Sequence, residues 1–314
     1  MNIASEDHRV DSGLDRLSVF VRNKRPAAGS SRPPVLFVHG ATYPSSVVFD
    51  YPVEGLSWMD WMAARGFDAW CVDLPGYGMS DRPAALSQAA EANPPTVRTA
   101  DAEAAVVRVA EFILGRRRAS RLSLVGYSWG TAICGGVATR RPDLAGRLVL
   151  SGALWCREQS VGIRMTGPLG AWREVTAEAI VQRWGVNLDA TQLAAIADAG
   201  HMQAWAEAAV ASDPGAGRAT PPVLRAPTGV IDDVQKFWLQ GKATWDPSAV
   251  QVPTLVVVGE WDRETTPEQG RQVFDRLPHA IERRMTVIGG GTHSLLLERQ
   301  RHQLYRTVGD FLTV

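Results

Sequence analysis

The segment LSLVGYSWGTAICGGVA, residues 122–138, joins two different patterns through a turn centred on Ser128. Residues Leu122–Val125 form an apolar run that is typical of a strand covered on both faces. The small residues after Gly130 predict a helix. We therefore expect a sharp strand-to-helix turn that holds Ser128 in a strained backbone conformation and exposes its hydroxyl above a sheet. A chance Gly-x-Ser-x-Gly sequence would lack this strand and this helix.

The residues around Ser128 suit nucleophilic chemistry. Side chains at Gly126 and Gly130 would collide with the neighbouring strand and helix, which explains both glycines. The N-terminus of the following helix favours developing negative charge. The backbone N–H of Trp129 can then donate one hydrogen bond to an oxyanion. The turn thus predicts a serine nucleophile at position 128.

The rest of the chain alternates short apolar runs with helical stretches, which predicts an α/β fold. The fold is a mostly parallel, twisted sheet with helices on both faces. The expected strands are Leu17–Val21, Val35–Val38, Ala69–Val72, Leu122–Val125, Leu148–Ser151, Leu255–Val258 and Met285–Ile288. The expected helices outside the insertion described next are residues 57–65, 101–114, 129–140, 267–276 and 294–311.

The alternation stops after the strand that ends at Ser151. Residues 156–247 show helical periodicity, turn signals such as Pro221-Pro222, and no convincing strand. The sheet pattern resumes at Val252-Pro253. We expect a helical cap, residues 156–247, inserted between two strands of a core formed by residues 1–155 and 248–314.

Composition excludes several classes of protein. The 314 residues include 33 Lys plus Arg and 33 Asp plus Glu, so no net charge attracts nucleic acid or an anionic membrane. No apolar run approaches the roughly 20 residues that span a bilayer, and the polar N-terminus does not resemble a signal peptide. Three scattered cysteines indicate neither a disulfide framework nor a zinc site. We expect a cytoplasmic protein that acts on a small molecule and needs no metal or cofactor. The oligomeric state stays open.

A histidine and a carboxylate follow the last two expected strands. His293 lies in Gly289-Gly-Gly-Thr-His, where a glycine-rich loop lets the imidazole reach the top of the sheet. Asp262 follows the strand before it, in Gly259-Glu-Trp-Asp, with Glu260 as the main alternative and Glu264 as a further neighbour. We expect His293 to act as the base for Ser128 and Asp262 to orient the imidazole and stabilise its charged form.

These motifs resemble those of the α/β-hydrolase superfamily over nearly the whole chain. The match comprises His39-Gly40, the segment Asp73–Ser80, the turn at Ser128, Gly259–Asp262 and Gly290–His293, and the chain order Ser, Asp, His is the same. The resemblance implies an eight-stranded sheet, whose first strand is either near residues 8–12 or absent. It also implies a second oxyanion N–H from Ala41, with Thr42 as the alternative, and a structural role for Asp73–Ser80.

The resemblance leaves several substrates open. Related dehalogenases and epoxide hydrolases carry an aspartate where this chain has Ser128, so acyl transfer to water is the expected reaction. A carboxylic ester of a small apolar or aromatic substrate is the first choice. An amide or peptide is the second, because the Ser-Trp-Gly turn is similar to that of proline iminopeptidases, although His39-Gly-Ala-Thr-Tyr-Pro44 departs from their loop. A carbon–carbon bond hydrolase and a non-catalytic ligand-binding homologue remain further alternatives.

The expected substrate contacts are mostly aromatic residues. Six of the 11 tryptophans fall in the expected cap or at its edge, and aromatic walls suit apolar substrates, although many of these rings would serve the core. The candidate substrate-binding residues are Thr42, Tyr127, Trp155 and Trp261.

Overall fold

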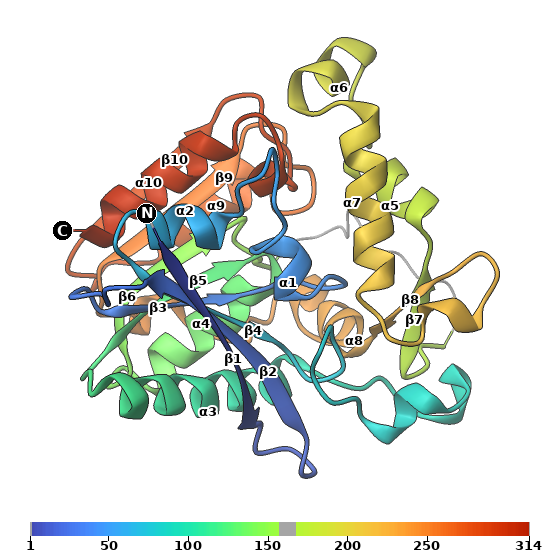
Figure 1. The fold of residues 1–314 in the computed structure, drawn as a ribbon, viewed down its shortest axis with the longest axis horizontal. Helices are drawn as coiled ribbons and strands as arrows, with labels where there is room; N and C mark the ends of the chain where they lie inside the picture. The colour runs from blue at the N-terminus through green and yellow to red at the C-terminus, as the bar shows by residue number, and fades with distance from the viewer. Residues whose placement is uncertain (1, 157–167, 314) are drawn as a thin grey trace.

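A single mixed sheet of eight strands organises the molecule (Figure 1), which the computed structural model describes over residues 2–156 and 168–313. The strand order is β1-β2-β4-β3-β5-β6-β9-β10, and only the β1–β2 and β2–β4 pairs are antiparallel. The expected fold class is therefore confirmed. The strands are β1 (Ile3–Asp11), β2 (Ser18–Pro26), β3 (Pro34–Val38), β4 (Asp68–Asp73), β5 (Leu122–Tyr127), β6 (Ala145–Ser151), β9 (Thr254–Gly259) and β10 (Arg283–Ile288).

Helices cover both faces of this sheet because successive strand residues point to opposite sides. In β3, Leu36 and Val38 join one buried cluster, whereas Val35 and Phe37 join the other. The first cluster includes residues of α3 (Thr99–Arg117), α4 (Trp129–Arg140) and α9 (Pro267–Asp275). The second includes residues of α1 (Ser45–Val48), α2 (Trp58–Ala64) and α10 (Arg301–Thr313).

The first strand, β1, is nine residues long and begins at Ile3, whereas the sequence left it either near residues 8–12 or absent. Its sequence IASEDHRVD is polar, so it carries no apolar signal, and Val10 is its one buried residue. Opposite charges face each other across its ladder with β2, where Asp7 pairs with Arg22. Charged edge strands of this kind also discourage pairing with other chains.

The region between β6 and β9 forms a separate group of elements beside the sheet (Figure 1). We call its described part, residues 168–247, the insert. It contains α5 (Ala177–Trp184), α6 (Ala190–Ile196), α7 (Ala199–Ala211) and α8 (Gly229–Lys236). The expectation that it has no strand is wrong, because β7 (Trp172–Val175) pairs antiparallel with β8 (Leu224–Pro227). Each strand has only four residues and the partners are far apart in sequence, so no local pattern indicates them.

The expected helix over residues 294–311 is wrong at its N-terminal end. A short 3₁₀ helix, η6, spans Leu295–Leu297, and α10 begins only at Arg301. Between them Glu298 turns its carboxylate back to the backbone N–H of Thr292, 2.9 Å away. The remaining 3₁₀ helices are η1 (Ala84–Ser87), η2 (Ala90–Ala92), η3 (Ala216–Arg218), η4 (Trp238–Gln240) and η5 (Pro247–Ala249).

Candidate active site

The turn between β5 and α4 holds Ser128 in a conformation that L residues rarely adopt. Its backbone angles are φ 54° and ψ −121°, and such strain persists only where the surroundings enforce it. A Cβ at Gly126 would lie 2.4 Å from the carbonyl oxygen of Gly130, and one at Gly130 would lie 2.1 Å from that of Val38. The two glycines therefore allow the turn, as their positions in the sequence predict.

Three side chains from separate loops meet at this turn. His293 Nε2 lies 2.9 Å from Ser128 Oγ, and His293 Nδ1 lies 2.8 Å from Asp262 Oδ2. Ser128 follows β5, Asp262 follows β9, and His293 follows β10. Because these strands are parallel, their carboxyl ends bring the three loops to one edge of the sheet. The expected nucleophile, base and orienting carboxylate are thus placed within hydrogen-bond distance of one another.

The carboxylate of Asp262 is fixed by its own loop. Its Oδ1 accepts hydrogen bonds from the N–H groups of Glu264, at 2.8 Å, and Thr265, at 2.9 Å, and the Thr265 hydroxyl donates to Oδ2 at 2.9 Å. The alternative carboxylate, Glu260, accepts instead from the N–H of Gly290 at 2.9 Å on the surface. The geometry therefore favours Asp262 over Glu260 as the partner of His293.

The imidazole of His293 has two anionic neighbours. Burial by itself disfavours the charged ring, but the carboxylates of Asp262 and Glu264 outweigh it and raise the pKa of His293 above its ordinary value. Glu264 Oε2 lies 3.7 Å from Nε2.

The loop that carries His293 is anchored by Tyr127. The hydroxyl of Tyr127 donates to the backbone oxygen of His293 at 2.8 Å.

The loop after β3 passes directly beside Ser128. A Cβ at Gly40 would lie 2.8 Å from Ser128 Cβ, so only glycine fits there. The next residue, Ala41, lines the cavity above Ser128. Trp129 is the first residue of α4, and its N–H has no acceptor within the helix. Both N–H groups of the expected oxyanion site therefore belong to residues that adjoin the Ser128 hydroxyl.

His39 supports this loop and is no second base. The Leu74 N–H donates to its Nε2 at 3.0 Å, so Nδ1 carries the proton that it donates to the Gly40 oxygen at 2.7 Å. Complete burial lowers the pKa of His39 to about 4, although its bond to Gly40 acts in the opposite direction. The ring is therefore neutral at ordinary pH and fixes the conformation of the loop.

The four expected substrate contacts are divided between cavity and core. Tyr127 lines the cavity beside Ser128. Thr42 is buried behind the loop, where its hydroxyl accepts a hydrogen bond from Arg173. Trp155 is 6% exposed and packs edge-to-face on Trp245, so it belongs to the core. Trp261 packs beside Gly290 at the surface of the sheet edge. The structure thus brings only Tyr127 of the four to the cavity.

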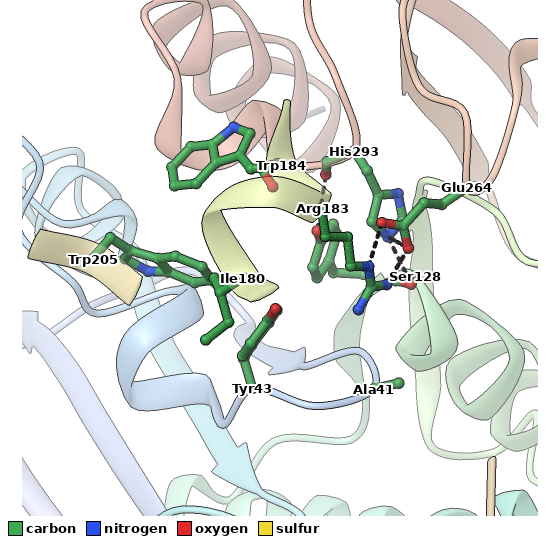
Figure 2. Close-up of a pocket in the computed structure, with 11 residues that line it drawn as sticks. Ala41, Tyr43, Ser128, Ile180, Arg183, Trp184, Trp205, Glu264 and His293 are labelled. Atoms are coloured by element: carbon green, nitrogen blue, oxygen red, sulfur yellow. Dashed lines mark hydrogen bonds and ion pairs between the residues drawn. The ribbon is translucent and has the colours of Figure 1, made fainter. Parts of the chain in front are cut away.

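The cavity over Ser128 is roofed by the insert (Figure 2). Its volume is about 30 Å³, which is room for about two water molecules. Helix α5 contributes Ile180, Arg183 and Trp184, and α7 contributes Trp205. The other lining residues are Ala41, Tyr43, Tyr127, Ser128, Glu264, His293 and Ser294.

An ion pair between Arg183 and Glu264 in this cavity was not predicted from the sequence. Arg183 Nε donates to Glu264 Oε1 at 2.7 Å, and its Nη2 contacts Glu264 Oε2. Figure 2 shows the guanidinium extending from α5 to the side of Ser128 and His293. Glu264 could have been noticed from its place two residues after Asp262. No local pattern distinguishes Arg183, because a single cation in an amphipathic helix is normally exposed to solvent.

Other site types have no support in the part of the chain described. Residues 2–156 and 168–313 contain no group of three His, Cys, Asp or Glu side chains that could hold a metal ion. Among the same residues, no helix combines the length and apolar character required to cross a bilayer.

The sheet order and the turn at Ser128 define this protein as an α/β-hydrolase enzyme. The chain belongs to the family described as "Serine aminopeptidase, S33", whose model matches residues 29–300. No curated protein matches the sequence significantly.

Solved structures share the fold at low sequence identity. A meta-cleavage product hydrolase from Pseudomonas fluorescens IP01 is 13% identical with a TM-score of 0.65, and covers 98% of this chain and 97% of its own. A serine hydrolase involved in carbazole degradation is 19% identical with a TM-score of 0.63, and covers 99% of both chains. An esterase from Exiguobacterium antarcticum is 17% identical with a TM-score of 0.63, and covers 98% of this chain and all of that one.

Proposed function

We propose that this hydrolase cleaves a carboxylic ester of a small apolar or aromatic substrate through an acyl-enzyme on Ser128. The observation that carries the proposal is the continuous relay from Asp262 Oδ2 through His293 to Ser128 Oγ, with contacts of 2.8 and 2.9 Å. The strained turn, the adjoining N–H groups of Ala41 and Trp129, and a cavity wall that includes two tyrosines and two tryptophans support it. No step requires a metal or an organic cofactor.

The reaction has two half-reactions of the same kind. Ser128 Oγ attacks the ester carbonyl while His293 Nε2 takes its proton, and the N–H groups of Trp129 and Ala41 stabilise the oxyanion. His293 then protonates the leaving alcohol as the carbon–oxygen bond breaks. A water molecule, deprotonated by the same nitrogen, attacks the acyl-enzyme and releases the acid and the free serine. Asp262 holds the imidazole in the tautomer that this sequence needs.

The insert acts in this proposal as the cap that closes the site. Trp184, Trp205 and Ile180 of the insert face the cavity, and such walls suit apolar or aromatic groups. Aminopeptidase activity is the second candidate, because the family description names it. The segment His39-Gly-Ala-Thr-Tyr-Pro44, which differs from the loop of similar iminopeptidases, favours the ester.

The test compares matched nitrophenyl esters and nitroanilides on the wild type and on Ser128→Ala. We expect faster ester cleavage, reduced by at least about 10⁴-fold in the variant, because the nucleophile is lost. Ser294→Ala is the matched control, since Ser294 also lines the cavity but His293 Nε2 bonds to Ser128. Ester turnover that persists in Ser128→Ala would refute the mechanism. Faster anilide cleavage would move the enzyme to the aminopeptidases, and no turnover of either would favour a carbon–carbon bond substrate or a binding role.

A further inference from the structure

The Arg183–Glu264 pair is an unusual wall for a cavity of this size. The side chains are 24% and 15% exposed, so both charges are largely removed from water. Pairs of this kind contribute little net stability, because desolvation offsets most of their attraction. Stability alone therefore does not explain two opposite charges beside the nucleophile.

The pair is aimed at the reacting atoms. Glu264 Oε2 lies 3.7 Å from His293 Nε2, and this nitrogen lies 2.9 Å from Ser128 Oγ. Arg183 contacts both carboxylate oxygens of Glu264 through its Nε and Nη2. This fork is the geometry in which a guanidinium recognises any carboxylate. The carboxylate of Glu264 thus occupies a position beside Ser128 in which a guanidinium can bind a planar anion.

A substrate must displace this arrangement, because the cavity of about 30 Å³ holds only about two water molecules. Arg183 belongs to α5 of the insert and Glu264 to the loop after β9, so a substrate that enters between them would separate the two side chains. A neutral substrate in that place would offer the guanidinium no charge in exchange for the carboxylate of Glu264. A substrate carboxylate could accept both of its N–H groups in place of Glu264.

A second guanidinium lies nearby and increases the positive charge. Arg173 of β7 donates to Thr42 Oγ1, and its Nε is buried without a hydrogen-bond partner among the described residues. Burial and the charge of Arg183 lower the pKa of Arg173 to about 10, and Glu264 is the carboxylate that opposes them. Arg173 therefore adds a second positive charge on the same side of the site as Arg183.

We propose that the enzyme selects an ester whose acyl part carries a carboxylate, and that Arg183 binds this carboxylate in the place now taken by Glu264. The inference rests on the proposed esterase function and specifies its substrate class. The apolar remainder of the substrate would lie toward Ile180 and Trp205, on the side of the cavity away from the ion pair (Figure 2).

The first experiment uses three methyl esters of similar length and different charge. They are monomethyl succinate, dimethyl succinate and methyl γ-aminobutyrate, with methanol release measured at neutral pH. We expect the wild type to prefer the anion in kcat/KM by roughly ten- to a hundredfold, the usual contribution of a bidentate charged pair. Preference for the cation would assign selection to Glu264 and overturn the proposal, as would equal rates for all three.

The variants separate recognition from structure. Arg183→Met should remove the preference for the anion, so that the ratio of kcat/KM for monomethyl succinate to that for dimethyl succinate falls to about one, whereas Arg183→Lys should keep part of the preference. Because Arg183→Met leaves Glu264 without its partner, the double variant R183M/E264Q provides the uncharged pair if the single variant folds poorly. Arg263→Met, an exposed arginine of the same loop as Glu264, is the control. Equal losses on charged and neutral esters would mean a structural role only and would overturn the proposal.

Direct binding distinguishes failure of this inference from failure of the esterase proposal. Calorimetry of succinate on Ser128→Ala should show binding that Arg183→Met, added to it, weakens by about tenfold or more. Such binding without turnover of any ester would retain the anion site and reject the esterase. Ser128-dependent turnover with no charge preference and no succinate binding would retain the esterase and reject the anion site.

Discussion

At the residue scale, the proposed chemistry depends on the charge of one imidazole. In the proposed mechanism His293 must be neutral to accept the proton of Ser128, and its pKa is raised because Asp262 and Glu264 together outweigh the effect of burial. In the proposed mechanism Asp262 orients the ring through Nδ1. The carboxylate of Glu264 lies 3.7 Å from the other ring nitrogen, Nε2, so its effect on His293 is electrostatic and can be tested separately.

The acid limb of kcat/KM for an uncharged nitrophenyl ester should therefore lie above the ordinary histidine value of about 6.5. Lowering the pH through the raised pKa protonates the base, so activity falls. Glu264→Gln removes the nearby anion and should move this limb to lower pH by roughly half a unit or more. Glu260→Gln, whose carboxylate bonds to Gly290 instead, is the matched control. An acid limb that stays in place in Glu264→Gln would show that Glu264 does not set the pKa of His293.

The proximity of Ser128, Asp262 and His293 could be predicted because each follows a strand directly in the sequence. The carboxyl ends of parallel strands meet at one edge, so chain order alone brings such residues together. The position of Arg183 could not be predicted in this way. It reaches Ser128 only through the packing of α5 on the core, which no local pattern encodes. Trp155 was expected at the cavity but lies in the core, where it packs edge-to-face on Trp245.

At the element scale, the loop that carries His293 is tied to the insert through one carboxylate. Glu298 is fully buried and accepts hydrogen bonds from the N–H and the hydroxyl of Thr292 and from Trp184 Nε1, the last at 2.9 Å. Burial raises the pKa of Glu298, which these bonds oppose. The interruption before α10, where a continuous helix was expected, places this carboxylate under Thr292. Glu298 is thus a positioning residue for His293.

Glu298→Gln tests this role. Its amide keeps one acceptor oxygen but presents an NH₂ group to donors, so at least one buried donor loses its partner. We expect the free energy of unfolding to fall by about 1–3 kcal/mol, measured in urea. We also expect kcat to fall more than KM rises, because His293 is displaced while the cavity wall remains. Glu207→Gln, on the exposed side of α7, is the control. Reduced stability with unchanged kcat would limit Glu298 to a structural role.

The strands show where local patterns suffice. The central strands β3, β5 and β9 are apolar because both faces are covered, so the sequence marks them directly. Edge strand β1 carries charged residues, and its partner strand supplies the opposite charges, which only the pairing reveals. Strands β7 and β8 are short and far apart in the sequence, so their pairing also depends on tertiary contacts.

At the scale of the whole molecule, the insert shares a hydrophobic core with the sheet. One buried cluster runs from Phe37 and Trp58 of the core to Trp184 and Trp205 of the insert. Trp205 is 2% exposed, and its Nε1 donates to the oxygen of Val47 at 2.7 Å. Its ring packs edge-to-face on Tyr43, with 4.9 Å between centroids. A shared core predicts that the insert and the sheet unfold together.

Trp205→Ala should test this coupling most directly. It removes a ring that is both cavity wall and contact between the insert and α1, so we expect a loss of about 3–5 kcal/mol in the free energy of unfolding. The transitions by tryptophan fluorescence and far-UV circular dichroism should still coincide, and KM for a nitrophenyl ester should rise. Trp205→Phe keeps an aromatic wall but loses the bond to Val47 and part of the buried ring, so its free energy of unfolding should lie between those of the wild type and Trp205→Ala. If the insert were an independent unit, Trp205→Ala would split the unfolding into two transitions. The second of these, that of the sheet, would then keep its wild-type midpoint.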